Sequence, residues 1–190
     1  FKGNTRRYII KLNSDGSEDT SFSVGTGFNG PAFETLLDPS TNGIYVPGNY
    51  TSYQSVSAAR FIKLKSDGSK DTTFSIPAFN TYTYNPKFDA SGYIVISGNF
   101  SVSNYVRHIK IDSSGNIYSG YDTTSGGFNA VPRNHVIDAS NNTLIVGSFQ
   151  TYKGAAANRV ARLLPNGSLD PSFVTGAGFD NTAQWLDIDN

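Results

Sequence analysis

The sequence predicts an all-β fold built from a repeated unit of about 50 residues. The observations behind this prediction are a turn-rich composition, a short motif that recurs four times, and alternating apolar residues around that motif. The chain has 190 residues, including 19 Gly, 13 Phe and 11 Tyr, and Asp outnumbers Glu by 13 to 2. Asp and Gly favour turns, aromatic residues favour strands, and Glu favours helix interiors. The composition therefore indicates strands joined by many turns.

The recurring motif is centred on a turn glycine. The segments "KLNSDGSEDTSF", "KLKSDGSKDTTF" and "RLLPNGSLDPSF" share one pattern, and a fourth copy, "DSSGNIYSGYD", departs from it. The turn glycines are 52, 47 and 52 residues apart, and each lies five residues after a basic residue and six before an aromatic one. Chance does not keep such columns in register over four copies. The columns are Gly16, Gly68, Gly115 and Gly167; Lys11, Lys63, Lys110 and Arg162; and Phe22, Phe74, Tyr121 and Phe173.

Hairpins are expected in the other half of each unit. The segments "LLDPSTNGIYVPGNY", "KFDASGYIVISGNF" and "VIDASNNTLIVGSF" each consist of a strand, a polar turn and a second strand. In the first of these, Ile44, Val46 and Tyr50 are expected on one face. Before the turn glycine, Lys11 alternates with apolar neighbours, so the basic column is expected to face solvent. A second aromatic column, in which each residue precedes Asn or Asp, consists of Phe28, Phe79, Phe128 and Phe179.

Repeated small antiparallel sheets are typical of a β-propeller. We therefore predict an all-β propeller, or a propeller-like array, of four-stranded antiparallel blades. One such sheet cannot bury both faces, so blade-on-blade packing would bury the Ile, Leu and Phe columns. A β-sandwich is the alternative, but it would not need the same turn at a fixed period. We expect one array over residues 1–190, a segment of a longer propeller, with units at about 1–52, 53–100, 101–151 and 152–190.

The pattern "GNYTSYQSVSAARFIKLKSDGSKDTTF" and its counterpart "GSFQTYKGAAANRVARLLPNGSLDPSF" resemble the delta-60 repeat. The resemblance covers the whole chain and is closest in the first, second and fourth units, whereas the third has a shorter loop and a different turn core. It implies a β-propeller from a large bacterial surface or secreted protein, or from a phage structural protein. It implies no particular activity, because the family has no settled one.

Aromatic residues at strand ends are the candidate ligand-binding residues. The segments "YTSY", "FSVSNY" and "FQTYKG" each follow a Gly-Asn or Gly-Ser strand end. Exposed rings there would offer flat apolar faces on which sugar rings stack, with Asn and Ser nearby to bond hydroxyls. The alternative is that the rings fill the space between neighbouring blades. The candidates are Tyr50, Tyr53, Phe100, Tyr105, Phe149 and Tyr152.

Metal binding has a weaker signal. Asp15 with Asp19, and Asp67 with Asp71, place two carboxylates in each of two Gly-containing turns, which makes them calcium candidates. A calcium loop normally gathers more carboxylates than this. The alternative is that each Asp bonds nearby backbone N–H groups. No metal and no cofactor is expected.

We expect no enzymatic activity. The two histidines, His108 and His135, occupy unrelated columns, and His108 replaces apolar residues, which indicates a packing position. Glu18 and Glu34 would form a glycosidase pair only if folding brought them to the required separation. No nucleophile, base and orienting acid stand out from the repeat.

Charge and composition narrow the remaining functions. The 15 basic and 15 acidic residues give no basic face for nucleic acid, no apolar run suits membrane insertion, and the absence of Cys excludes disulfides. We expect a non-enzymatic extracellular, cell-surface or virion-exposed module for attachment or structural display. Its partners would be other blades of the parent chain, and proteins of a surface or virion assembly or surface glycans. The alternatives are a glycan-binding lectin that uses the loop aromatics, and a purely structural component of a phage tail or of a bacterial surface secretion or motility complex.

Overall fold

The computed structural model describes residues 7–121 and 126–189, and every regular element in these residues is a β-strand. No helix in this part of the chain is long and apolar enough to cross a membrane. The all-β class is therefore confirmed. The strands are β1 (Leu36–Leu37), β2 (Ile44–Pro47), β3 (Ser52–Tyr53), β4 (Val56–Ser57), β5 (Phe61–Leu64), β6 (Thr83–Phe88), β7 (Ile94–Val102), β8 (Tyr105–Ile111), β9 (Gly126–Gly127), β10 (Pro132–Ile137), β11 (Thr143–Gly147), β12 (Thr151–Tyr152), β13 (Ala155–Ala156) and β14 (Val160–Leu163).

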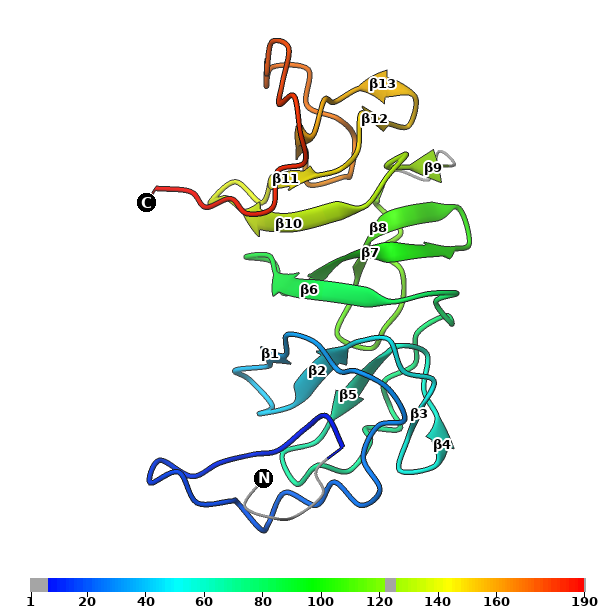
Figure 1. Cartoon of the computed structure of the whole chain (residues 1–190), viewed down its shortest axis with the longest axis vertical. Helices are drawn as coiled ribbons and strands as arrows, with labels where there is room; N and C mark the ends of the chain where they lie inside the picture. The colour runs from blue at the N-terminus through cyan, green and yellow to red at the C-terminus, as the bar shows by residue number, and fades with distance from the viewer. Residues whose placement is uncertain (1–6, 122–125, 190) are drawn as a thin grey trace.

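Three sheets follow one another in an open row (Figure 1). Their strand orders are β1-β2-β5, β6-β7-β8-β9 and β10-β11-β14, and β3–β4 and β12–β13 form separate small hairpins. All neighbouring strands are antiparallel except β8 and β9. The first strand of each later sheet contacts the sheet before it, since β10 lies against β6 and β7, and β6 lies against β2. Within the described residues the sheets do not close into a ring.

A single bridge adds a fourth segment to the last long strand of each sheet. These bridges follow the turn glycines, as the repeated motif requires. Each sheet with its bridge therefore approximates the four-stranded blade that the sequence predicts. The bridged pairs are Leu64 with Lys70, Ile111 with Ile117, and Leu163 with Leu169.

The four turn glycines adopt the left-handed conformation that the turns require. Their φ angles lie between 78° and 95°, a region that glycine occupies without steric cost. Two of these turns also meet the preceding repeat, because the backbone N–H of Ser23 donates to Asp67 O at 2.8 Å and that of Ser75 donates to Ser114 O at 3.0 Å. A Cβ at Gly115 would lie 2.3 Å from Ser75 O. The turn therefore joins successive repeats as well as reversing the chain.

The second aromatic column forms the centre of a ring cluster in the first three repeats. Its first three members are at most 1 % exposed. Burying one such side chain contributes about 1.5–3 kcal/mol, so this column is a main source of stability. The ring pairs are Phe28 with Tyr50, Phe79 with Phe100, and Phe128 with Phe149, at centroid distances of 4.3, 4.5 and 4.3 Å.

The Asn after each of these Phe residues holds a loop of the same cluster. Oδ1 of Asn80 accepts the backbone N–H of Ser101 at 2.7 Å, and its amide donates to the Ser101 hydroxyl at 2.9 Å. Oδ1 of Asn29 and of Asn129 accepts backbone N–H groups of the corresponding loops. The Phe-Asn dipeptide therefore supplies both apolar burial and a loop anchor.

An arginine column that the sequence reasoning did not single out joins each sheet to the Phe of the second aromatic column that follows that sheet in the chain. These arginines lie eight residues before a turn glycine and have left-handed φ angles between 63° and 69°. The guanidinium of Arg107 donates to the carbonyl oxygen of Phe128 at 2.7 Å. A hydrogen bond from a charged donor contributes about 1.5–3 kcal/mol, and the strained backbone opposes it. The pairs are Arg60 with Phe79, Arg107 with Phe128, and Arg159 with Phe179.

The expectation that the basic column faces solvent is wrong at two of its four positions. The side chains of Lys63 and Lys110 are 8 % and 6 % exposed. Nζ of Lys63 lies 3.0 Å from Oδ2 of Asp38, and Nζ of Lys110 lies 2.6 Å from Oδ2 of Asp89. The other two basic side chains are 44 % and 27 % exposed. In the first and second sheets, the Asp that precedes the hairpin turn therefore lies beside the basic residue of its own sheet and pairs with it, whereas Arg162 of the third sheet pairs with Asp170.

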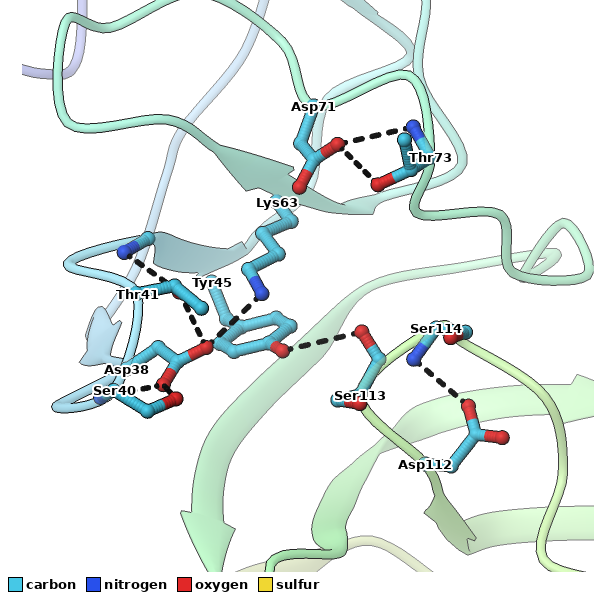
Figure 2. A network of polar contacts seen from close by, with 11 residues as sticks. Asp38, Ser40, Thr41, Tyr45, Lys63, Asp71, Thr73, Asp112, Ser113 and Ser114 are labelled. Carbon is cyan, nitrogen blue, oxygen red and sulfur yellow. Dashed lines mark hydrogen bonds and ion pairs between the residues drawn. The ribbon is translucent and has the colours of Figure 1, made fainter.

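Figure 2 shows how the carboxylate of Asp38 is held. It accepts hydrogen bonds from the Ser40 backbone and hydroxyl and from the neighbouring Thr41 hydroxyl. Burial acts to raise the pKa of Asp38, but these bonds and the one from Lys63 outweigh it and hold the pKa below its usual range. The Lys63 ammonium also lies 4.8 Å from the centroid of the Tyr45 ring. The ion pair is therefore enclosed by hydroxyls and an aromatic face.

We expect Lys110→Met to lower the free energy of unfolding by about 3–5 kcal/mol, because it leaves the Asp89 carboxylate buried without its cation. Lys11→Met, in the same column, should have a much smaller effect because that side chain is largely exposed. Urea denaturation followed by circular dichroism measures both. Adding Asp89→Asn to Lys110→Met should recover part of the loss. Equal losses for the two lysine variants would show that the Lys110 pair is not the buried contact described above.

Candidate functional site

The six aromatic residues proposed to bind a ligand are all buried, at 7 % exposure or less. Two of the tyrosines donate their hydroxyls to the carbonyl oxygens of turn glycines at 2.7 Å: Tyr53 to Gly68 and Tyr152 to Gly167. These rings pack within the repeats, and no ring face is left for a sugar. Stacking of sugars on them stays a hypothesis that would require the core to open. The six residues are Tyr50, Tyr53, Phe100, Tyr105, Phe149 and Tyr152.

The four aspartates considered for calcium each bond the Ser or Thr two residues further on. Oδ1 of Asp15 accepts the backbone N–H of Ser17 at 2.8 Å and its hydroxyl at 2.6 Å. The hydroxyl bond is the first cause of the lowered pKa of Asp15, and the backbone bond adds to it. No group of three or more His, Cys, Asp or Glu placed to hold a metal occurs in the part of the chain that the structure describes. The four turn residues are Asp15, Asp19, Asp67 and Asp71.

The two histidines meet in the contact between the second and third sheets, although they occupy unrelated columns of the repeat. His108 on β8 is 3 % exposed, and His135 on β10 is completely buried. Oγ of Ser97 lies 2.9 Å from Nδ1 of His135 and 3.4 Å from Nδ1 of His108. Nδ2 of Asn85 lies 3.4 Å from the same His135 nitrogen. The packing position expected for His108 is confirmed, and its polar partners are a result of the fold.

Burial keeps both imidazoles neutral. It lowers the pKa of His108 to about 3, with a contribution from Lys153. It also lowers the pKa of His135 well below its usual value, with contributions from His108 and Lys87. A hydroxyl 2.9 Å from an imidazole is the arrangement of a nucleophile and its base, but Ser97 has no exposed surface. The cluster is therefore a buried polar contact that no substrate reaches without separation of the sheets.

An open groove lies along the first strands of the repeats. Tyr84 on β6 and Arg133 on β10 line it, and β6 and β10 are neighbours in the row, with the C-terminal segment beside β10 (Figure 1). The rings of Tyr82 and Tyr84 stack at 5.9 Å, and Phe33 meets Tyr82 edge-on at 6.3 Å. The groove holds about 350 Å³. We call it the aromatic groove; it is lined by Phe33, Tyr82, Tyr84, Arg133, Gln184 and Trp185.

Most of the groove comes from one column of the repeat, five residues after the second aromatic column. Two neighbouring columns keep their residue type in every copy: the second aromatic column, which is always Phe, and the column ten residues after it, which is always Asp. The groove column, in contrast, carries a phenyl, a phenol, a guanidinium and an amide. The sequence reasoning missed it by searching for residues that recur. The signal is a column that fails to recur within a regular repeat, and dissimilar side chains on a rigid frame are typical of binding surfaces. The column is Phe33, Tyr84, Arg133 and Gln184.

Comparison with known families supports one class of protein. Residues 1–22, 41–74 and 139–173 match the family model described as "Domain of unknown function (DUF5122) beta-propeller". The matches contain three of the four turn glycines and omit Gly115, in the unit expected to depart most from the pattern. No curated protein and no solved structure matches the chain significantly. The matches, together with the antiparallel sheets, support a β-propeller repeat family.

We expect the buried histidines to make the protein less stable as the pH falls below about 6.5. In the unfolded chain His108 regains its ordinary pKa of 6.5, whereas its pKa in the folded chain is about 3. Between these values only the unfolded state binds the proton, so stability is full above pH 6.5 and declines toward pH 3. The slope is about 1.4 kcal/mol per pH unit for this residue. Thermal unfolding at pH 7 and pH 5, at constant ionic strength, measures the loss.

The control for this prediction is His108→Phe. It gives position 108 the residue type of Phe61, which occupies the same column of the preceding unit. This variant should show a weaker dependence of the melting temperature on pH than the unmodified protein. If its dependence on pH is the same, other groups cause the acid sensitivity.

Proposed function

We propose that this chain is a non-enzymatic β-propeller module that presents a ligand-binding edge for attachment in an extracellular, cell-surface or virion-exposed protein. The observation that carries the proposal is the contrast between the columns of the repeat that recur and hold the fold together and the one column at the groove that varies. Contacts through the Phe, Asn and Arg columns recur from repeat to repeat. The column of Phe33, Tyr84, Arg133 and Gln184 differs in every copy and lies at the aromatic groove.

The resemblance to the delta-60 repeat supports the same proposal. The repeats that resemble it best lie in the units that match the β-propeller family model. The finer assignment to delta-60 repeats, with their setting in bacterial surface proteins or phage particles, is part of this proposal. Short edge strands such as β1 and β14 also suit a protein exposed to solvent, because they offer little backbone for pairing with other chains.

The proposal of a non-enzymatic role is supported by the position of the residues that could perform chemistry. Ser97 lies 2.9 Å from His135 in the arrangement of a nucleophile and its base, and both residues are completely buried. The carboxylates of Asp38 and Asp89 are bonded to lysines of their own sheets. The exposed polar groups of the groove, in contrast, are suited to holding a ligand.

We expect the parent protein to be accessible from outside intact cells or particles. Antibodies raised against the 190-residue chain should label intact cells or virions that carry the parent, and added protease should remove the signal. A cytoplasmic protein of the same cells, or an internal protein of the same particles, should stay protected in the same sample and serves as the control. Labelling that appears only after lysis would overturn the proposed location.

A further inference from the structure

We propose that the aromatic groove binds an acidic saccharide, with pyranose rings against its aromatic side chains and a carboxylate on the Arg133 guanidinium. This inference rests on the proposed function and names the class of ligand that the same edge would take. The ring faces of the groove, its unpaired polar groups and its charge all favour such a ligand.

The ring faces are accessible at both ends of the groove. Trp185 is 80 % exposed and Phe33 is 40 % exposed, unlike the aromatic residues of the repeat core. Between them, the Tyr82 and Tyr84 rings lie at an interplanar angle of 27°. Aromatic rings placed in this way combine a flat apolar face with a polar edge. The C–H faces of pyranose rings pack against such surfaces, so a saccharide chain fits the succession of rings along the groove.

The polar groups of the groove have unused bonding capacity. Arg133 is exposed and makes no hydrogen bond or ion pair with the residues that the structure describes. The Tyr84 hydroxyl is buried and has no hydrogen-bond partner in the same residues. Because that hydroxyl is enclosed by the protein, a ligand in the groove would meet the ring of Tyr84 and not its hydroxyl. The Gln184 amide completes a set of groups that match sugar hydroxyls.

The charge of the groove favours an acidic saccharide over a neutral one. Glu34 and Asp187 are the acids closest in sequence to the groove residues, and neither forms an ion pair with Arg133. An arginine presents a planar fork of N–H donors that binds a carboxylate through two parallel bonds. By contrast, Arg107 and Arg159 of the arginine column donate hydrogen bonds to backbone carbonyl oxygens. Arg133 is therefore available for a ligand.

The single Trp of the chain makes the groove directly observable, because Trp185 is its only tryptophan fluorophore. We would titrate the full chain with a trimer of galacturonate and with the fully methyl-esterified trimer, which has the same rings without the charge. The acidic trimer should change the Trp185 fluorescence in a saturating manner. The ester should bind at least about tenfold more weakly, because it lacks the charge-assisted bonds to Arg133.

Two variants introduce residues that the same column carries in other repeats. Arg133→Gln introduces the residue type of Gln184 and should remove the preference for the acid over the ester. Tyr84→Phe introduces the residue type of Phe33, keeps the ring that lines the groove and removes only the enclosed hydroxyl, so it should leave the affinity for both ligands nearly unchanged. Lys65→Gln removes an exposed charge from a turn outside the groove and is the matched control. It should bind as the unmodified chain does.

The inference is overturned if the acidic trimer causes no saturating change, if the ester binds equally well, or if Arg133→Gln keeps the preference. A pentaglutamate peptide that binds as tightly as the trimer, with the same dependence on Arg133, would replace the saccharide by an acidic peptide. Surface labelling of the parent protein together with failure of these titrations would reject the ligand class and leave the proposed attachment function. Protection of the parent protein from antibody and protease would instead reject that function.

Discussion

The contact between successive sheets is the constraint on which the rest of this structure depends. A sheet of three or four short strands has two apolar faces and cannot bury both alone. Phe79 and Phe128 are therefore fully enclosed within repeats that are themselves covered by the next repeat. The Arg107 guanidinium reaches from β8 of the second sheet to the carbonyl oxygen of Phe128, which lies in the segment that leads to β10 of the third sheet. These contacts recur because every repeat is a small sheet whose apolar faces must be covered by its neighbours.

One contact between sheets departs from this regular scheme. The backbone N–H of Thr83 donates to Gly48 O between the first and second sheets, and that of Ala183 donates to Gly147 O at the far end of the row, both at 3.3 Å. Pro132 occupies the same column in the remaining repeat and has no N–H to donate. There, side chains make the polar contact instead, through the pairing of Ser97 with His135. The histidine cluster is thus a local substitute for a backbone bond.

The recurring contacts between repeats also explain which surface is free to bind a ligand. The Phe, Asn and Arg columns that hold the structure together keep one residue type in at least three of the four copies, and their rings and polar groups are used within the protein. The edge formed by the first strands is not restricted in this way, so Phe33, Tyr84 and Arg133 can differ while sharing one position of the repeat. Because a rigid frame holds these side chains, a ligand would meet them already in place, which lowers the entropic cost of binding.

The turns, the repeat period and the strand segments follow from the amino-acid sequence alone. A turn glycine such as Gly68 is required by a left-handed φ angle, which depends only on its immediate neighbours. Which side chains are enclosed, in contrast, depends on how the sheets pack. Lys63 was expected to face solvent by alternation, but its partner Asp38 lies 25 residues earlier. His108 and His135 met only because their strands lie in adjacent sheets. Burial depends on the surface that the next sheet presents, and no local pattern contains that surface.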